Sequence, residues 1–223
     1  FLGRAVRYLA ARGITQFLDI GSGLPTRGNV HQVAREVSPD ARVVYADIDP
    51  VVVAHARALL ADSPAAAGPK VTAAGADLRY PRNLITTREI REHLDLDQPV
   101  GLLLVAVLHF LTDSSRPHEA VRYLAGRLAP GSYIVISHVT ADHISPEAAR
   151  AAEAVYDGAS APGVTRSRDD IERFFDGLEI VPPGVTNAST WRPGPAPAPG
   201  LIGRLGQPTL FYAGIGRIPE PPR

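Results

Sequence analysis

The stretch FLDIGSGLPTRG, residues 17–28, decides the fold of this 223-residue chain. It reads as a short apolar strand carrying one acid, then a glycine turn, and an amphipathic segment from Asn29 to Val37 follows at once. Strand, glycine loop and helix in this order open the nucleotide-binding half of a doubly wound α/β sheet. Glycine lets the backbone approach a ligand closely, and the helix N-terminus presents N–H groups to it. The stretch therefore predicts an α/β protein with a ligand at this loop.

The bulk composition is that of an ordinary globular protein, with 45% apolar and 21% charged residues. Lys+Arg and Asp+Glu are 23 each, so there is no global basic field that would attract nucleic acid or an anionic membrane. The chain has no cysteine, which excludes disulfides, thiolate metal sites and a cysteine nucleophile. No apolar run is long enough to span a membrane and no signal peptide opens the chain, so we expect a cytoplasmic protein. Because it starts at Phe1 and contains no methionine, we expect it to be part of a longer protein.

Strand and helix patterns alternate over the first 140 residues. The predicted strands cover 16–20, 42–47, 70–74, 100–108 and 133–139, and the predicted helices cover 3–12, 29–37, 50–62, 87–94 and a segment opened by Pro117. Five such repeats predict a parallel sheet with helices on both faces. The run 100–108 is the most apolar, which is typical of a central strand that is covered on both sides.

The tail breaks this rhythm. Helices are expected over 145–156 and after Ser167, where a capping-box-like start occurs, and strands over 178–181 and 209–215. Because no helix pattern separates the last two strands, we expect an antiparallel pair at one edge of the sheet. We expect one domain over residues 1–223, made of a leading helix (1–13), a cofactor-binding core (14–140) and C-terminal helices, loop and edge strands (141–223).

The glycine loop departs from the pattern of dinucleotide-binding proteins. Those proteins have a third glycine three residues after the second, and here that position is Thr26. Asp19, two residues before Gly21, would repel the phosphates of a dinucleotide. It suits a positively charged ligand, such as the α-ammonium group of a methionine moiety.

Two further acids follow predicted strands. Asp47 ends the second strand, where a carboxylate can accept hydrogen bonds from both ribose hydroxyls. Asp77 follows the third strand and is placed to meet an adenine amino group, with Ala76 and Leu78 beside the ring. All these groups fall at the carboxyl ends of strands, where open α/β sheets bind their ligands.

Each of these signals has a plain structural alternative. The two glycines could serve only a tight turn, and Asp19 could cap the next helix or pair with Arg27. Asp47 could pair with a nearby arginine, and Asp77 could be an ordinary turn residue. Their joint occurrence at the right strand ends favours a cofactor site.

Several stretches resemble a known family. DIGSG (19–23), YADIDP (45–50) and ADL (76–78) resemble the first three cofactor motifs of class I methyltransferases that depend on S-adenosylmethionine (SAM). GLPTRGNVH (23–31), LLLVAVLHF (102–110), PGSYIVISH (130–138) and AGIGR (213–217) resemble a family of SAM methyltransferases from high-GC bacteria, formerly a domain of unknown function. The resemblance covers nearly the whole chain. It implies a doubly wound, Rossmann-like sheet of seven strands, mostly parallel with an antiparallel last strand.

The resemblance also implies SAM as cofactor, S-adenosylhomocysteine (SAH) as product, and a set of binding residues. These cofactor-binding residues are Asp19, Gly21, Ser22, Gly23, Thr26, Asn29, His31, Asp47, Ile48, Ala76, Asp77, Leu78 and Val107. Asn29 and His31 would contact the methionine end of SAM, or simply cap their helix. Pro25 replaces the third glycine of the usual methyltransferase loop, so the cofactor carboxylate must find donors around Thr26 to Asn29. The family usually carries an upstream segment that this chain lacks, and we expect that segment to help close the site.

The catalytic residues are less evident from the sequence. Methyl transfer is an in-line displacement that depends mainly on alignment of the acceptor, and a general base is optional. His109, after the fourth strand, is either that base or a structural histidine bonded to a backbone carbonyl. The polar residues after the fifth strand read more simply as a loop start with caps than as a metal site: His138, Thr140, Asp142 and His143. Three residues could line a substrate pocket, although a lone tryptophan in a proline-rich loop more often pins that loop: Tyr80, Trp191 and Arg192.

The sequence thus predicts a methyltransferase that acts on a small molecule and binds neither nucleic acid nor membrane. Two alternatives remain open at this stage. One is an NAD(P)-dependent oxidoreductase, which Asp19 and the absent third glycine disfavour. The other is a SAM-binding protein without catalytic activity.

Overall fold

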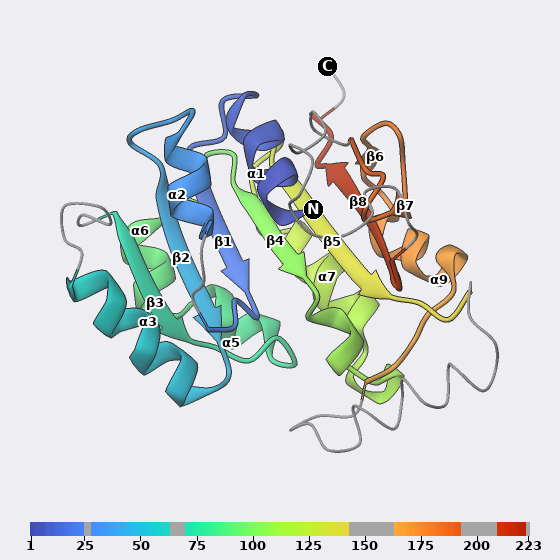
Figure 1. Cartoon of the computed structure of the whole chain (residues 1–223), viewed down its shortest axis with the longest axis horizontal. Coiled ribbons are helices and arrows are strands. Elements are labelled where there is room, and N and C mark those ends of the chain that lie inside the picture. The colour runs from blue at the N-terminus through green and yellow to red at the C-terminus, as the bar shows by residue number, and fades with distance from the viewer. Residues whose placement is uncertain (25–27, 63–69, 143–162, 193–208, 222–223) are drawn as a thin grey trace, which may run out of the picture.

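The computed structural model describes residues 1–24, 28–62, 70–142, 163–192 and 209–221. Within them the strands form one sheet in the order β3-β2-β1-β4-β5-β8-β6, with β7 also paired to β8 (Figure 1). The strands are β1 (Gln16–Ile20), β2 (Arg42–Asp47), β3 (Val71–Gly75), β4 (Gly101–Val105), β5 (Tyr133–Val139), β6 (Glu179–Ile180), β7 (Thr186–Asn187) and β8 (Phe211–Arg217). The first five are parallel, and β8 runs antiparallel to β5, β6 and β7. The expected fold class and the antiparallel edge are confirmed.

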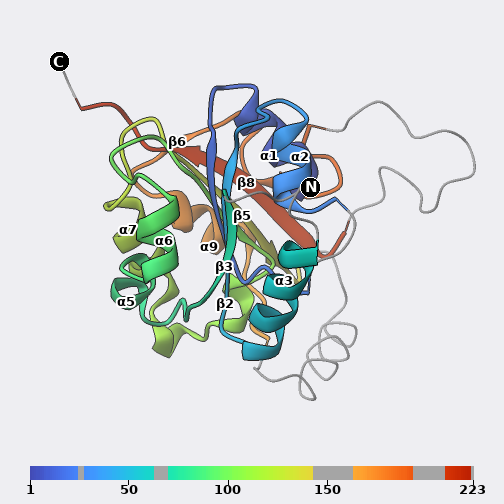
Figure 2. The ribbon, with the colours of Figure 1, turned by 90° about the vertical axis from the view of Figure 1, so that its left-hand side faces the viewer.

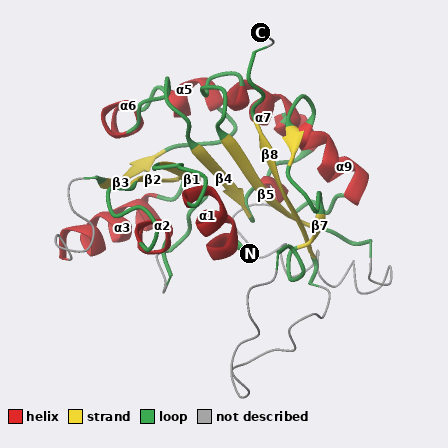
Figure 3. Ribbon diagram, turned by 90° about the horizontal axis from the view of Figure 1, so that it is seen from above, coloured by secondary structure: helices red, strands yellow, loops and turns green. Residues whose placement is uncertain are grey.

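Helices cover both faces of this sheet (Figures 2 and 3). One face carries α1 (Leu2–Ala10), α2 (Val30–Arg35) and α3 (Pro50–Asp62). The other carries α5 (Pro81–Ile85), α6 (Arg88–His93), α7 (Pro117–Ala125) and α9 (Arg168–Glu172). A hydrophobic core lies between the sheet and the helices on each face. Successive residues of β1 point into different cores: Phe17 packs on the α1, α2 and α3 side, and Leu18 packs on the α5, α6 and α7 side. All five β1 residues are buried, as they must be in a strand with helices on both sides.

The helix starts follow the local sequence. The carboxylate of Asp49 accepts a hydrogen bond from Val51 N at 2.8 Å, with Pro50 as the first residue of α3. Asn29 and Gln32 form a capping box at the start of α2. Ser167 Oγ accepts from Asp170 N at 3.2 Å and so caps α9.

Strand β4 is shorter than the apolar run predicts. It ends at Val105, and Leu108–Phe110 form a 3₁₀ turn. The chain leaves the sheet at Ala106, whose φ of 56° is incompatible with a strand. Leu108 is fully buried although it lies beyond the strand, so the apolar pattern of the sequence predicted a strand that continues to residue 108.

Other elements differ from the predictions in detail. Helix α5 precedes the helical stretch expected over 87–94, and the two-residue strand β7 lies in what the sequence presented as a loop. The helix expected over 145–156 lies outside the described residues. Trp191 is fully buried, with the rings of Phe1 and Tyr8 edge-on at 5.3 and 5.7 Å. It pins its loop to α1, as a lone tryptophan commonly does.

In the part of the chain described here, none of the helices combines the length and the apolar character that crossing a membrane requires.

Candidate active site

The carboxyl ends of β1, β2, β3 and β4 lie side by side at one edge of the sheet (Figure 1). Parallel pairing sets Asp19 level with Tyr45, and Asp47 level with Gly75. The ends of these four strands and the segments that follow them carry the described residues that the sequence predicts for the cofactor. The topology therefore brings together groups that are distant along the chain.

The glycine loop packs directly against the loop after β4. Gly21 has φ of 71°, and a Cβ added to it would lie 2.3 Å from Val107 Cγ2. Only glycine fits here without displacing Val107. Gly23 also has a positive φ, 63°, but it faces open space. Ser22 lies between them and is half-buried. The loop thus presents bare backbone along an open side.

Asp47 is held in place by this loop. Its Oδ2 accepts from Gly23 N at 2.9 Å and its Oδ1 from Asp49 N at 3.0 Å. A carboxylate has about four lone-pair positions, so two further hydroxyl donors can be accepted. This arrangement fits the two hydroxyls of a ribose. Ile48, next to it, is 58% exposed and offers an apolar surface.

Asp19 is a buried carboxyl group beside a second one. It lies on the same face of the sheet as Tyr45, and Asp47, two residues after Tyr45, shares that face. Burial, reinforced by the negative charge of Asp47, raises the pKa of Asp19 to about 7. It does not cap α2, because Asn29 and Gln32 do so, and Arg27 lies outside the described residues. A cationic ligand group at this point would offset the repulsion between the two carboxylates.

His31 is fixed beneath the loop by Tyr45, which the sequence reading missed. Tyr45 Oη accepts from His31 N at 3.0 Å and lies 2.8 Å from His31 Nδ1. Since Oη accepts the amide hydrogen, its own hydrogen is available for Nδ1, and the ring proton then belongs on Nε2. Burial, with Arg35 nearby, lowers the pKa of His31. The sequence held one sign of this contact: Tyr45 and Asp47 are two residues apart in a strand, so their side chains share one face of the sheet.

The third acid is engaged within its own turn. Both oxygens of Asp77 accept from the Arg79 side chain at 2.7–3.0 Å, and Oδ1 also accepts from Arg79 N. Burial alone would raise the pKa of Asp77, but these bonds hold it below its usual value. Leu78 packs in the core, and Ala76 donates its N–H to the Asp47 carbonyl at 2.8 Å. The adenine contact of this group stays a prediction.

His109 lies in the 3₁₀ turn after β4 and is only 2% exposed. Its ring packs against those of Phe110, His138 and Phe211, at centroid distances of 4.3, 5.7 and 5.9 Å. Burial, with the positive charge of Arg166 as a second cause, lowers the pKa of His109 to about 4. The imidazole is therefore neutral at physiological pH, as either a weak base or a structural ring.

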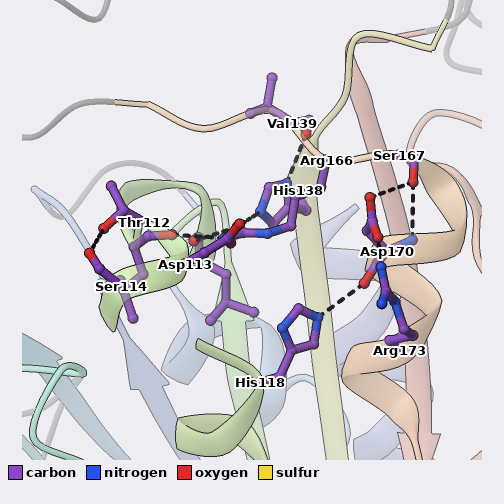
Figure 4. Close-up of polar contacts among 12 residues, drawn as sticks. Thr112, Asp113, Ser114, His118, His138, Val139, Arg166, Ser167, Asp170 and Arg173 are labelled. Atoms are coloured by element: carbon purple, nitrogen blue, oxygen red, sulfur yellow. Dashed lines mark hydrogen bonds and ion pairs between the residues drawn. The ribbon is translucent and has the colours of Figure 1, made fainter. Parts of the chain in front are cut away.

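His138 is engaged in backbone and side-chain bonds (Figure 4). Its Nδ1 donates to the Val139 carbonyl at 2.7 Å and its Nε2 accepts from Arg166 Nη1 at 2.8 Å. Burial is the main cause that lowers its pKa to about 3. Asp142 accepts from Arg168 N and donates its own N–H to Thr140 Oγ1, so these residues cap a loop as expected.

Some predicted positions lie away from this edge or outside the structure. Thr26 and His143 are outside the described residues. Tyr80 is 61% exposed, and Arg192 stacks over Tyr8 at 4.4 Å, beside the pinned loop. Among the ranges that the structure describes, no group of three or more His, Asp or Glu side chains could hold a metal ion.

Comparison with known proteins places this chain in a family. The family described as S-adenosyl methyltransferase matches residues 1–219. A candidate methyltransferase from Thermobifida fusca is 39% identical, with 98% of this chain and 79% of that chain covered and a TM-score of 0.83. A duf574 family protein from Streptomyces avermitilis is 37% identical, with 98% and 81% covered and a TM-score of 0.86.

More distant similarity reports on the fold. An O-methyltransferase family protein from Burkholderia thailandensis is 17% identical over 97% of this chain and 55% of its own, with a TM-score of 0.63. No match was found among curated proteins. The family match confirms both the expected resemblance and SAM as the expected cofactor. This chain belongs to the S-adenosyl methyltransferase family.

Proposed function

We propose that this chain transfers the methyl group of SAM to a small-molecule acceptor and releases SAH. The observation that carries the proposal is the juxtaposition at one sheet edge of the open glycine loop with Asp19 and Asp47. Two carboxylates suit the ribose and the positive charges of SAM, and they oppose the phosphates of a dinucleotide. The absent third glycine argues in the same direction, against an oxidoreductase.

The proposed roles follow from what each group can donate or accept. Asp47 would accept both ribose hydroxyls, and the ionised form of Asp19 would balance the α-ammonium group. The carboxylate of the methionine moiety would find its donors around Thr26 to Asn29, because the N–H groups of Gly21, Ser22 and Gly23 already donate to the Ala46 carbonyl and to Asp47. Ile48 and the segment 76–78 would border the adenine ring. When bound, SAM supplies an electrophilic methyl group on a sulfonium centre.

The protein contributes mainly alignment. The wall nearest to the glycine loop is formed by Val107, which contacts Gly21. An acceptor held between this wall and the segment after β4 would be oriented for in-line attack, which is the dominant catalytic effect for such a displacement.

We propose His109 as a positioning residue, with the general base as the competing role. A pKa of about 4 leaves the ring unprotonated above pH 5, but makes it a poor proton acceptor. Its packing against three rings ties the segment after β4 to β5 and β8. A His109→Gln variant separates the roles: a base would lower kcat at unchanged SAH affinity, whereas a positioning residue would change both.

The net charge of the chain argues against a polyanionic acceptor, and the class of small molecule can be tested directly. The chain is formally neutral, which gives no attraction for a polyanion. Incubation with SAM and a panel of small phenols, amines and carboxylic acids should release SAH with at least one class. Tight SAH binding without turnover on any acceptor would instead support a non-catalytic SAM-binding protein.

A further inference from the structure

A cavity lies next to the segment that follows β4. It has a volume of about 410 Å³ and is lined by the start of α7, the residues before α9, and α9 with the turn after it. None of its lining residues belongs to the proposed cofactor site. Its size is within the range of cavities that hold small organic ligands. We refer to it as the Arg166 pocket.

The pocket is built around a buried cation. The Arg166 side chain is only 5% exposed. Its guanidinium donates to the Leu111 carbonyl at 3.0 Å, more weakly to the Leu108 carbonyl at 3.4 Å, and to His138 Nε2 at 2.8 Å (Figure 4). These three acceptors are neutral. Arg166 is thus fixed in position, and none of the three balances its charge.

The counterion of Arg166 is easily exchanged. Among the described residues it is Asp113, which makes one contact, from Oδ1 to Nη2 at 2.6 Å. The Asp113 side chain is 86% exposed. Water stabilises this carboxylate whether or not it contacts the arginine, whereas the buried guanidinium always requires an anion. A ligand anion can therefore replace Asp113 at little cost.

The other arginines that line the Arg166 pocket are also paired with acids that a bound anion could replace. Arg116 pairs with Glu119 at 3.5 Å, with both side chains more than 60% exposed, and Arg173 pairs with Asp170 one turn away on the same segment. Such surface pairs are weak and leave both arginines available. The N-terminus of α7, which has no side-chain cap, also faces this pocket and adds partial positive charge.

We infer that the Arg166 pocket binds a small organic acid through its carboxylate or phosphate group, which takes the place of Asp113 on Arg166. The bound anion and the proposed cofactor would contact the same segment after β4, because Arg166 holds the carbonyls of Leu108 and Leu111 and Val107 lies against Gly21. The inference does not depend on methyl transfer. It rests on the cavity and on a fixed cation with an exchangeable partner.

The test is isothermal titration of inorganic phosphate, and separately of succinate, into the chain saturated with SAH. SAH occupies the glycine loop, which could otherwise attract anions. We expect one saturable site for at least one of the two probes, and the tighter probe identifies the preferred acid group. Binding that disappears when SAH is present would place the anion in the glycine loop and overturn the inference. Failure of SAH itself to bind would be a separate result, against the proposed function.

Variants make the test specific. Asp113→Asn removes the competing charge, and we expect phosphate or succinate to bind about tenfold more tightly. Arg166→Gln should abolish binding, and SAH affinity reports whether that variant is folded. Glu36→Gln removes a comparable surface pair, with Arg7, and should change nothing. If Arg166→Gln does not fold, the Asp113→Asn result decides. Unchanged or weaker binding in Asp113→Asn would refute the inference.

Discussion

Replacing Asp19 with asparagine should stabilise the ligand-free chain at alkaline pH and weaken its binding of SAH. Burial and the charge of Asp47 raise the pKa of Asp19 from 3.8 to about 7. The folded state therefore retains a proton that the unfolded state releases, and this stabilisation is lost as pH rises from 3.8 through 7. At about 1.4 kcal/mol per pH unit, the loss approaches ~4 kcal/mol above pH 7. Asparagine has nearly the same shape and no charge to bury.

Urea unfolding at pH 5 and pH 8 measures this effect. We expect Asp19→Asn to exceed the parent by about 2–4 kcal/mol in free energy of unfolding at pH 8, and by much less at pH 5. Asp97→Asn, at an exposed position, is the control and should show no such pH dependence. SAH affinity should fall about tenfold or more, because a charge-assisted contact is lost. The reasoning is refuted if the stability difference is absent at pH 8 or is equal at both pH values.

Three further predictions concern packing and acid stability. Gly21→Ala should lower the free energy of unfolding by about 2 kcal/mol and weaken SAH binding, because its Cβ would lie 2.3 Å from Val107 Cγ2; a variant with parental stability in urea would contradict this contact. Trp191→Ala should cost about 3–5 kcal/mol by loss of buried surface, with SAH affinity unchanged in calorimetry; a loss of affinity at retained stability would instead place Trp191 in the binding site. His109 and His138, with pKa values lowered to about 4 and about 3, stay neutral in the folded state while the unfolded state binds protons below pH 6.5. Each should therefore reduce the free energy of unfolding by about 1.4 kcal/mol per pH unit as pH falls from 6.5 toward 4, so the two together give about 2.8 kcal/mol per pH unit. Urea unfolding of Asp19→Asn, which lacks the opposing effect of the Asp19 carboxyl group, measures this summed slope, and a flat profile would contradict the prediction.

Much of the sheet could be predicted because its strands have local signatures. β1, β2 and β5 begin and end where the apolar runs and the turn residues indicate. β4 was predicted too long because burial continues past Val105 while the backbone turns away at Ala106. A positive φ at an alanine has no signal in the sequence, unlike one at glycine or asparagine.

The candidate functional residues likewise include some that a local sequence pattern indicates and some that it does not. The sequence predicts that Gly21, Asp19 and Asp47 lie together because each lies at or next to the carboxyl end of a strand, and these strand ends meet at one edge. Their contacts with the cofactor stay predictions. The ligand contact of Asp77 stays a prediction, and in the structure its carboxylate accepts hydrogen bonds from Arg79, two residues along, which the sequence did not indicate. Arg166 has no local pattern, since its partners lie 28 to 58 residues away in sequence. Tertiary structure alone brings them together.

The most direct test of the account is calorimetric titration of SAH and of NADH into the chain and into two Asp47 variants. We expect SAH to bind and NADH not to bind. Asp47→Ala should weaken SAH binding by about 1.5–3 kcal/mol, since the ribose and Gly23 both lose an acceptor. Asp47→Asn, which keeps one acceptor oxygen, should lose less. Binding of NADH in place of SAH, or full SAH affinity in Asp47→Ala, would contradict the assignment of this sheet edge to SAM.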